Sequence, residues 1–149
     1  MFPAKILPTV WSGVPSSSFH APQFSEADNR ELYGKCNNPF GHGHDYTLEV
    51  SVRGPVDEAT GRVVHIDALD RLVRSQVLEP FDHRDLNAEA PVFSQLVPTT
   101  ENLAIEIRSR LEAGWASAIP VPRPSLDSVR LSETRRNFFE VRGNHEESQ

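Results

Sequence analysis

The sequence predicts an α+β domain in which two helices cover one face of an antiparallel sheet. Three observations support this class. Residues 45–53 alternate apolar and polar side chains, which is typical of a half-buried strand. Two later segments, 67–79 and one that begins near residue 99, carry apolar residues at helical spacing. Two strand-like segments, 129–133 and 137–141, then follow as a hairpin, so strands and helices are segregated along the chain.

Length and composition indicate one globular domain spanning residues 1–149. The chain is 38% hydrophobic and 24% charged, with a formal net charge of −6. It has no Lys/Arg-rich run, which argues against a nucleic-acid partner. The lone cysteine, Cys36, favours a reducing compartment. Early prolines interrupt the N-terminus and no long apolar run follows, so we expect no signal peptide, no membrane span and a cytoplasmic location.

The N-terminal part of the chain predicts little regular structure. Residues 1–35 read as irregular, with one strand somewhere within 4–14. The first clear strand is 45–53. Its apolar face consists of Tyr46, Leu48, Val50 and Val52.

The first predicted helix covers residues 67–79, and Pro80 is expected to stop it. Its apolar positions are Ile66, Leu69, Val73 and Val77.

The second predicted helix begins at Thr99 or Thr100, either of which can cap it, with Glu101 at the positive end of the dipole. Gly114 is a plausible C-cap, and prolines 120, 122 and 124 mark a linker. The apolar stripe of this helix is Leu103, Ile107 and Leu111.

The strongest chemical signal is Gly41-His42-Gly43-His44 before the strand at 45–53. Residues two apart in an extended chain share a face, so His42 and His44 can supply two ligands of a tetrahedral zinc ion. His20, the only upstream histidine, is the natural third ligand. The alternative is a loop with two solvated histidines.

Three further residues are candidates for acid–base work. A zinc ion near Cys36 would favour its thiolate, although a lone cysteine also suits a small buried position. Asp82 and His83 are adjacent, so the acid can set the tautomer of the imidazole and form a proton relay. Taken alone, this dipeptide is equally a surface feature.

Glu133 continues the apolar row of Val129 and Leu131 at a strand end. A carboxylate in that position either has a partner or marks a pocket, where it can accept two N–H bonds from a ligand. The alternative is a glutamate that reaches water.

These segments together resemble the 6-pyruvoyltetrahydropterin synthases and the related 6-carboxytetrahydropterin synthases. The cysteine and zinc motif corresponds to residues 32–46, LYGKCNNPFGHGHDY. The match continues through 56–57, 60–61, 82–87 (DHRDLN), 98–102 (PTTEN) and 132–134 (SET). In all it covers about residues 22–142, in the right order, and leaves 143–149 as a polar tail.

The resemblance implies the tunnelling fold, a four-stranded antiparallel sheet with two helices packed on one face. It implies a trimer-based homo-oligomer, a hexamer, with active sites at subunit interfaces. Cys36 would be the general base, and Asp82 and His83 would form its relay, supplied by a neighbouring subunit. The zinc would be bound by His42 and His44. Glu133 would anchor the pterin, helped by Thr99, Thr100 and Glu101.

The implied activity is that of a zinc-dependent lyase acting on 7,8-dihydroneopterin triphosphate. Triphosphate leaves by elimination, and the product is 6-pyruvoyl- or 6-carboxy-tetrahydropterin. The chain departs from the family at the first zinc histidine, because an ungapped alignment from Asn29 puts Ser17 there. His20 replaces that ligand only if the loop to Cys36 is three residues shorter. Two alternatives follow: a non-catalytic pterin- or metal-binding paralogue, or a dihydroneopterin aldolase-like activity.

Overall fold

A computed structural model of the chain describes residues 5–13, 15–17, 25–33 and 42–143. Its centre is a four-stranded antiparallel sheet with the strand order β1-β4-β5-β6. The strands are β1 (Lys5–Gly13), β4 (Tyr46–Gly54), β5 (Ser125–Ser132) and β6 (Phe138–Arg142). A separate two-stranded ladder joins β2 (Ser16–Ser17) to β3 (His42–Gly43).

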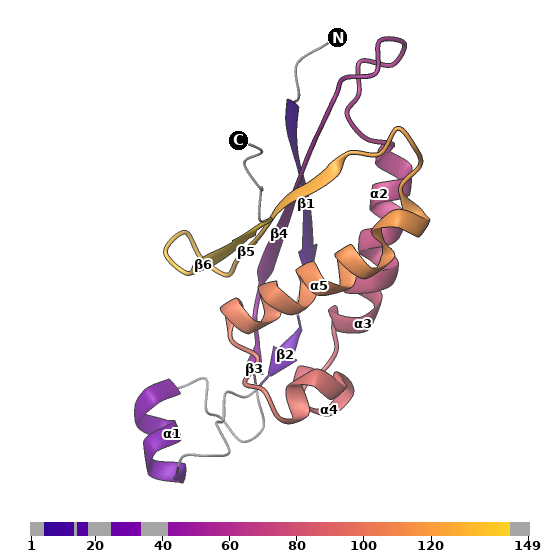
Figure 1. The fold of residues 1–149 in the computed structure, drawn as a ribbon. Coiled ribbons are helices and arrows are strands. Elements are labelled where there is room, and N and C mark those ends of the chain that lie inside the picture. The colour runs from indigo at the N-terminus through magenta and orange to yellow at the C-terminus, as the bar shows by residue number, and fades with distance from the viewer. Residues whose placement is uncertain (1–4, 14, 18–24, 34–41, 144–149) are drawn as a thin grey trace.

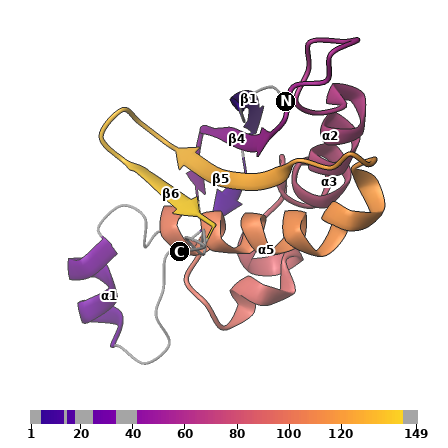
Figure 2. The ribbon, with the colours of Figure 1, turned by 45° about the horizontal axis from the view of Figure 1, so that its top comes forward.

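Two helical segments form one layer on the same face of this sheet (Figures 1 and 2). The first runs from α2 (Ile66–Val73) through a π-helical segment η2 (Arg74–Leu78) into α3 (Glu79–Phe81). The second is the long helix α5 (Thr100–Ala118). Along the chain, these two segments are connected by α4 (Leu86–Glu89) and the 3-10 turn η3 (Pro91–Ser94). The predicted α+β class and the two-helix layer are confirmed.

The core forms between the inner face of the sheet and these helices. The predicted apolar face of β4 is confirmed, because all four of its side chains are at most 5% exposed. The stripe on α5 and the inward residues of α2 meet this face. The buried side chains of this core include Leu69, Val73, Val77, Leu103, Ile107 and Leu111 from the helical segments and Val129 and Leu131 from β5.

Strand β1 lies at an edge of the sheet and is tied to the helical layer. The indole Nε1 of Trp11 donates a hydrogen bond to Asp70 Oδ1 at 2.9 Å. This bond, together with Arg74, lowers the pKa of Asp70. The strand predicted within residues 4–14 is therefore confirmed and anchored on α2.

Pro80 does not stop the first helix, which continues to Phe81. Proline removes one N–H donor and crowds the carbonyl four residues before it. The wider π-helical turn directly before Pro80 accommodates both effects. The helix ends instead at Asp82, whose backbone is extended.

Gly114 is not a C-cap, because α5 runs past it to Ala118. A Cβ at this position would lie 2.8 Å from Leu72 Cδ1 on α2. The glycine therefore permits the close approach of the two helices, which is a role that the sequence of one helix does not reveal.

The expectation that residues 1–35 are irregular is wrong for one segment. Helix α1 (Glu26–Tyr33) begins after Ser25, whose Oγ accepts a hydrogen bond from the backbone N–H of Asp28 at 3.1 Å. Acidic residues in its first turn favour the start of the helix. Within the part of the chain that the structure describes, no helix has both the length and the apolar character needed to cross a bilayer.

Candidate active site

One candidate site lies where β4 begins and β5 ends. In the antiparallel ladder Thr47 pairs with Ser132, so the residues just outside both strands come together. His44 Nδ1 lies 2.9 Å from Glu133 Oε1, although 89 positions separate the two residues. The His44 side chain is fully buried, and 26% of the Glu133 side chain is exposed. Glu133 therefore has a partner, and that partner, His44, is one of the predicted zinc ligands.

The ring of Tyr46 packs against the ring of His44. The two rings stack with their centroids 5.8 Å apart and their planes inclined by 26°. This contact confirms that His44 shares the strand parity of Tyr46. The parity of His42 is untested, because its side chain is not among those described.

The backbone register of the β2–β3 ladder bears on the first zinc ligand. Ser17 is the Cα partner of His42, and His44 N–H donates to the carbonyl of Pro15 at 2.9 Å. Residue 17 therefore lies directly beside the histidine motif. His20 and Cys36 lie outside the described residues.

The zinc site itself stays a prediction. Among the described residues, no three His, Cys, Asp or Glu side chains are grouped so as to hold a metal ion. His44 nevertheless fits the chemistry of a zinc ligand, because metal-binding histidines commonly donate their other ring N–H to a carboxylate. Glu133 occupies that place.

The second candidate group is Asp82 and His83, directly after α3. His83 Nδ1 lies 3.0 Å from Asp82 Oδ1, so the two adjacent side chains do meet. The backbone here is unusual, since His83 has φ = 56°, in the left-handed region. Strain of this kind concentrates at functional sites. The His83 side chain is 78% exposed, which leaves its ring accessible to a substrate or to another subunit.

Gly13, at the end of β1, lies against the first member of this pair. A Cβ added to Gly13 would be 3.3 Å from Asp82 Oδ1, a tight contact. The sheet therefore limits where the carboxylate can lie. Neither Gly13 nor Tyr46 was predicted as part of a site, because only the tertiary fold brings them to these side chains.

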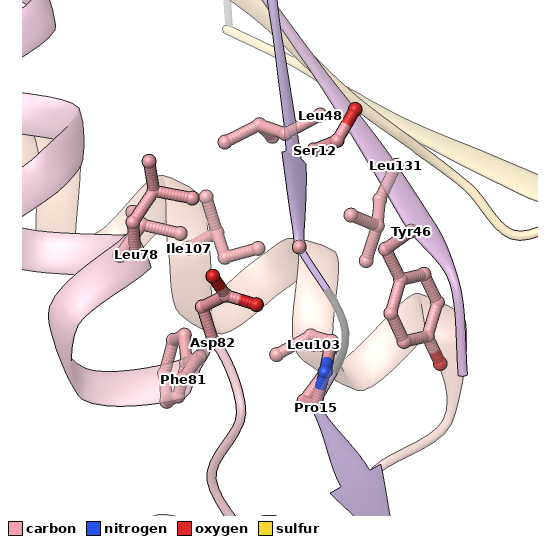
Figure 3. A pocket seen from close by; sticks show the side chains of 12 residues that line it. Ser12, Pro15, Tyr46, Leu48, Leu78, Phe81, Asp82, Leu103, Ile107 and Leu131 are labelled. Carbon is pink, nitrogen blue, oxygen red and sulfur yellow. The ribbon is translucent and has the colours of Figure 1, made fainter. Parts of the chain in front are cut away.

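One member of each group, Asp82 and Tyr46, borders a common cavity at this end of the sheet (Figure 3). Asp82 faces it from the end of α3, and Tyr46 faces it from β4. The cavity has a volume of about 30 Å³ and is otherwise lined mainly by apolar side chains such as Leu103 and Leu131. Ligand pockets usually hold roughly 300–1,000 Å³. This cavity is therefore too small to receive a pterin.

The predicted pterin helpers lie at the start of α5. Thr99 is the N-cap, and its Oγ1 accepts a hydrogen bond from Asn102 N–H at 3.2 Å. Thr100 is buried and Glu101 is exposed. The predicted helix start is confirmed, and the role of these residues toward a pterin stays a prediction.

Asn137 is a site residue that sequence reasoning missed. Its side-chain amide donates to Glu133 Oε2 at 2.8 Å, and its backbone carbonyl accepts from Glu133 N–H at 2.9 Å. Its own N–H donates to Thr134 Oγ1 at 3.0 Å, which orders the turn. The available signal was an asparagine directly after the predicted hairpin turn, since this residue often bonds back to nearby groups.

Comparisons with known proteins agree on one family. A family model described as 6-pyruvoyl tetrahydropterin synthase matches residues 16–144. A 6-pyruvoyl tetrahydrobiopterin synthase of Poecilia reticulata is 40% identical over 124 residues, which cover 83% of this chain and 80% of that protein. The enzyme of the same name from Drosophila melanogaster is 38% identical over 125 residues, or 83% and 71% of the two chains. The solved structure of Caenorhabditis elegans 6-pyruvoyl tetrahydropterin synthase superposes with a TM-score of 0.84 at 35% identity, over 96% of this chain and 98% of that chain.

Proposed function

The chain belongs to the 6-pyruvoyl tetrahydropterin synthase family and has its tunnelling fold, and on that premise we propose that it is a zinc-dependent pterin lyase. Its substrate is 7,8-dihydroneopterin triphosphate, and its products are 6-pyruvoyl-tetrahydropterin and triphosphate. The observation that carries the proposal is the contact between His44 and Glu133. It joins a member of the histidine motif to the carboxylate that the family resemblance assigns to the pterin.

The reaction needs no external oxidant or reductant. Elimination of triphosphate and proton shifts along the side chain reduce the dihydropterin ring while the side-chain carbons become carbonyl carbons. A zinc ion held by His42, His44 and His20 would polarise the side-chain oxygens and acidify the neighbouring C–H bonds. The Cys36 thiolate would take and return protons, and Asp82 would orient His83 as the partner in proton transfer.

Assembly into a homo-oligomer, a hexamer of paired trimers, completes the proposal. One observation supports it. His83 is 78% exposed beside its carboxylate partner, as expected for a group that acts toward a neighbouring subunit. The lone cysteine supports a cytoplasmic location.

The direct test is product identification by mass spectrometry after the purified, zinc-loaded protein is incubated with 7,8-dihydroneopterin triphosphate. We expect 6-pyruvoyl-tetrahydropterin and free triphosphate. A 6-carboxy product would keep the lyase chemistry and change the product, whereas a 6-hydroxymethyl product would indicate the aldolase-like alternative. An unchanged substrate with bound zinc would favour the non-catalytic paralogue.

Replacing Glu133 with glutamine will weaken pterin binding. The carboxylate can accept two N–H bonds from the amino-pyrimidine edge, and loss of a bond to a charged group costs about 1.5–3 kcal/mol. Calorimetry with a product analogue measures the affinity. The matched control is Glu140→Gln on β6, which removes one carboxylate from the same hairpin. An affinity equal to that of the control would contradict the anchoring role.

Replacing His20 with alanine will weaken zinc binding, whereas replacing Ser17 will not. Imidazole binds zinc far better than a neutral hydroxyl, even though residue 17 is the Cα partner of His42. Zinc stoichiometry and competition with a chelator give the comparison. Tight zinc in the His20→Ala protein would mean that two histidines and another donor form the site, which would favour the non-catalytic alternative.

A further inference from the structure

We infer that Glu133 has a second role, in which it and Asn137 are positioning residues for the metal-binding nitrogen of His44. This inference rests on the proposed zinc site. The two hydrogen bonds form a chain from the β5–β6 turn to the imidazole: Asn137 Nδ2 to Glu133 Oε2 at 2.8 Å, and His44 Nδ1 to Glu133 Oε1 at 2.9 Å. Each carboxylate oxygen thus has its own protein donor.

The first consequence concerns the tautomer of His44. A carboxylate accepts hydrogen bonds and does not donate them, so the proton of the neutral ring lies on Nδ1. That tautomer places the lone pair on Nε2, where a metal can use it. In water, neutral imidazole interchanges its two tautomers. The Glu133 carboxylate therefore selects the form of His44 that is able to bind zinc through Nε2.

The second consequence concerns the orientation of the ring. His44 is fully buried. Its ring stacks on Tyr46 at a centroid distance of 5.8 Å, and its Nδ1 contacts the Glu133 carboxylate. Glu133 lies just past the end of β5, where its side chain would otherwise be free to rotate. The Asn137 amide removes that freedom, and the Thr134 Oγ1 bond to Asn137 N–H orders the turn from which it acts.

The third consequence concerns how one carboxylate can serve both zinc and pterin. An ionised carboxylate has about four acceptor sites. His44 and Asn137 use one each, and 26% of the Glu133 side chain remains exposed. Two acceptor sites are left for the two N–H groups of a pterin edge. The same side chain can then align the substrate relative to the metal ligand that it orients.

Three variants separate this role from pterin anchoring. Glu133→Ala removes the acceptor for His44, and loss of such an outer partner weakens metal binding by roughly 10–100-fold. Glu133→Gln keeps a carbonyl oxygen for Nδ1–H, and its amide can bond to a flipped Asn137 side chain, so zinc affinity should stay near the wild-type value. The zinc affinity of Asn137→Ala should lie between those of the two Glu133 variants. Glu140→Ala, on the same hairpin, is the control, and it should leave the zinc affinity and the His44 tautomer unchanged.

Two measurements are needed. Competition with a chromogenic chelator gives the zinc affinity of each protein. Long-range ¹H–¹⁵N NMR of the histidine rings, recorded on the zinc-free proteins at mildly alkaline pH, shows which nitrogen of His44 carries the proton. We expect the Nδ1–H form in the wild type, Glu133→Gln and Glu140→Ala, and a shift toward Nε2–H in Glu133→Ala.

Two results would overturn the inference alone. One is a Glu133→Ala protein that binds zinc as tightly as a zinc-binding wild type. The other is a wild-type His44 whose proton lies on Nε2, and this second result requires no variant to fold. A wild-type protein that takes up no zinc would overturn the proposed zinc-dependent function together with the inference.

Discussion

Replacing Cys36 with alanine will abolish turnover and leave the zinc content of the protein unchanged. The thiol lies six residues before His42 and outside the proposed ligand set of His20, His42 and His44. A thiolate near a metal ion and imidazoles has a lowered pKa, so it can act as a base near neutral pH. A general base contributes about 10²–10⁴-fold to a rate, and the alanine side chain carries no group that can replace it.

The measurement is the rate of triphosphate release, together with metal analysis of the same preparation. A second variant, Cys36→Ser, keeps the size of the side chain but has a hydroxyl that ionises only at far higher pH, so it should also be inactive. Loss of zinc along with activity would make Cys36 a metal ligand and would overturn its assignment as the base.

Replacing Asp82 with asparagine will lower kcat by about two to four orders of magnitude, with little change in zinc content. The carboxylate lies 3.0 Å from His83 Nδ1 and, as an acceptor, holds the ring proton on that nitrogen. Asparagine has nearly the same shape but offers a competing N–H₂ donor, which favours the wrong tautomer. The fold should persist, because the substitution adds no atoms on the side of Gly13, where even a Cβ would lie only 3.3 Å from Asp82 Oδ1.

The control for this variant is Glu79→Gln, which removes one exposed carboxylate from the same helix end. Steady-state kinetics of both proteins separate kcat from KM. If Asp82→Asn keeps the kcat of the control, the contact with His83 is structural, and the relay must involve other groups.

The sequence was informative wherever structure depends on near neighbours along the chain. Alternation predicted the buried face of β4. The cap of α5 was narrowed to Thr99 or Thr100, because a cap bonds to a residue three positions later, and the structure identifies it as Thr99. The parity of His44 with Tyr46 followed from the same local geometry, and their stacked rings confirm it. The family resemblance extended this to the sheet, the helical layer and the residue types of the site.

Local patterns misled where a distant segment determines the conformation. Gly114 resembles a helix end, yet α5 continues past it to Ala118, and a Cβ at this position would lie 2.8 Å from Leu72 Cδ1 of α2. Pro80 resembles a stop, yet the π-helical turn before it lets the helix reach Phe81. A glycine or a proline alone therefore does not fix where a helix ends.

The sequence by itself therefore determined the class of the fold and the order of its main strands and helices, and it predicted which side chains could do chemistry. Only the tertiary structure decided which of these side chains meet. Glu133 meets His44 because the β4–β5 register aligns two strand ends that are far apart in the sequence. Asp82 meets His83 directly after α3, where the backbone of His83 lies in the left-handed region. Contacts of this kind depend on long-range register and on strained backbone angles, and neither leaves a periodic signal in a sequence.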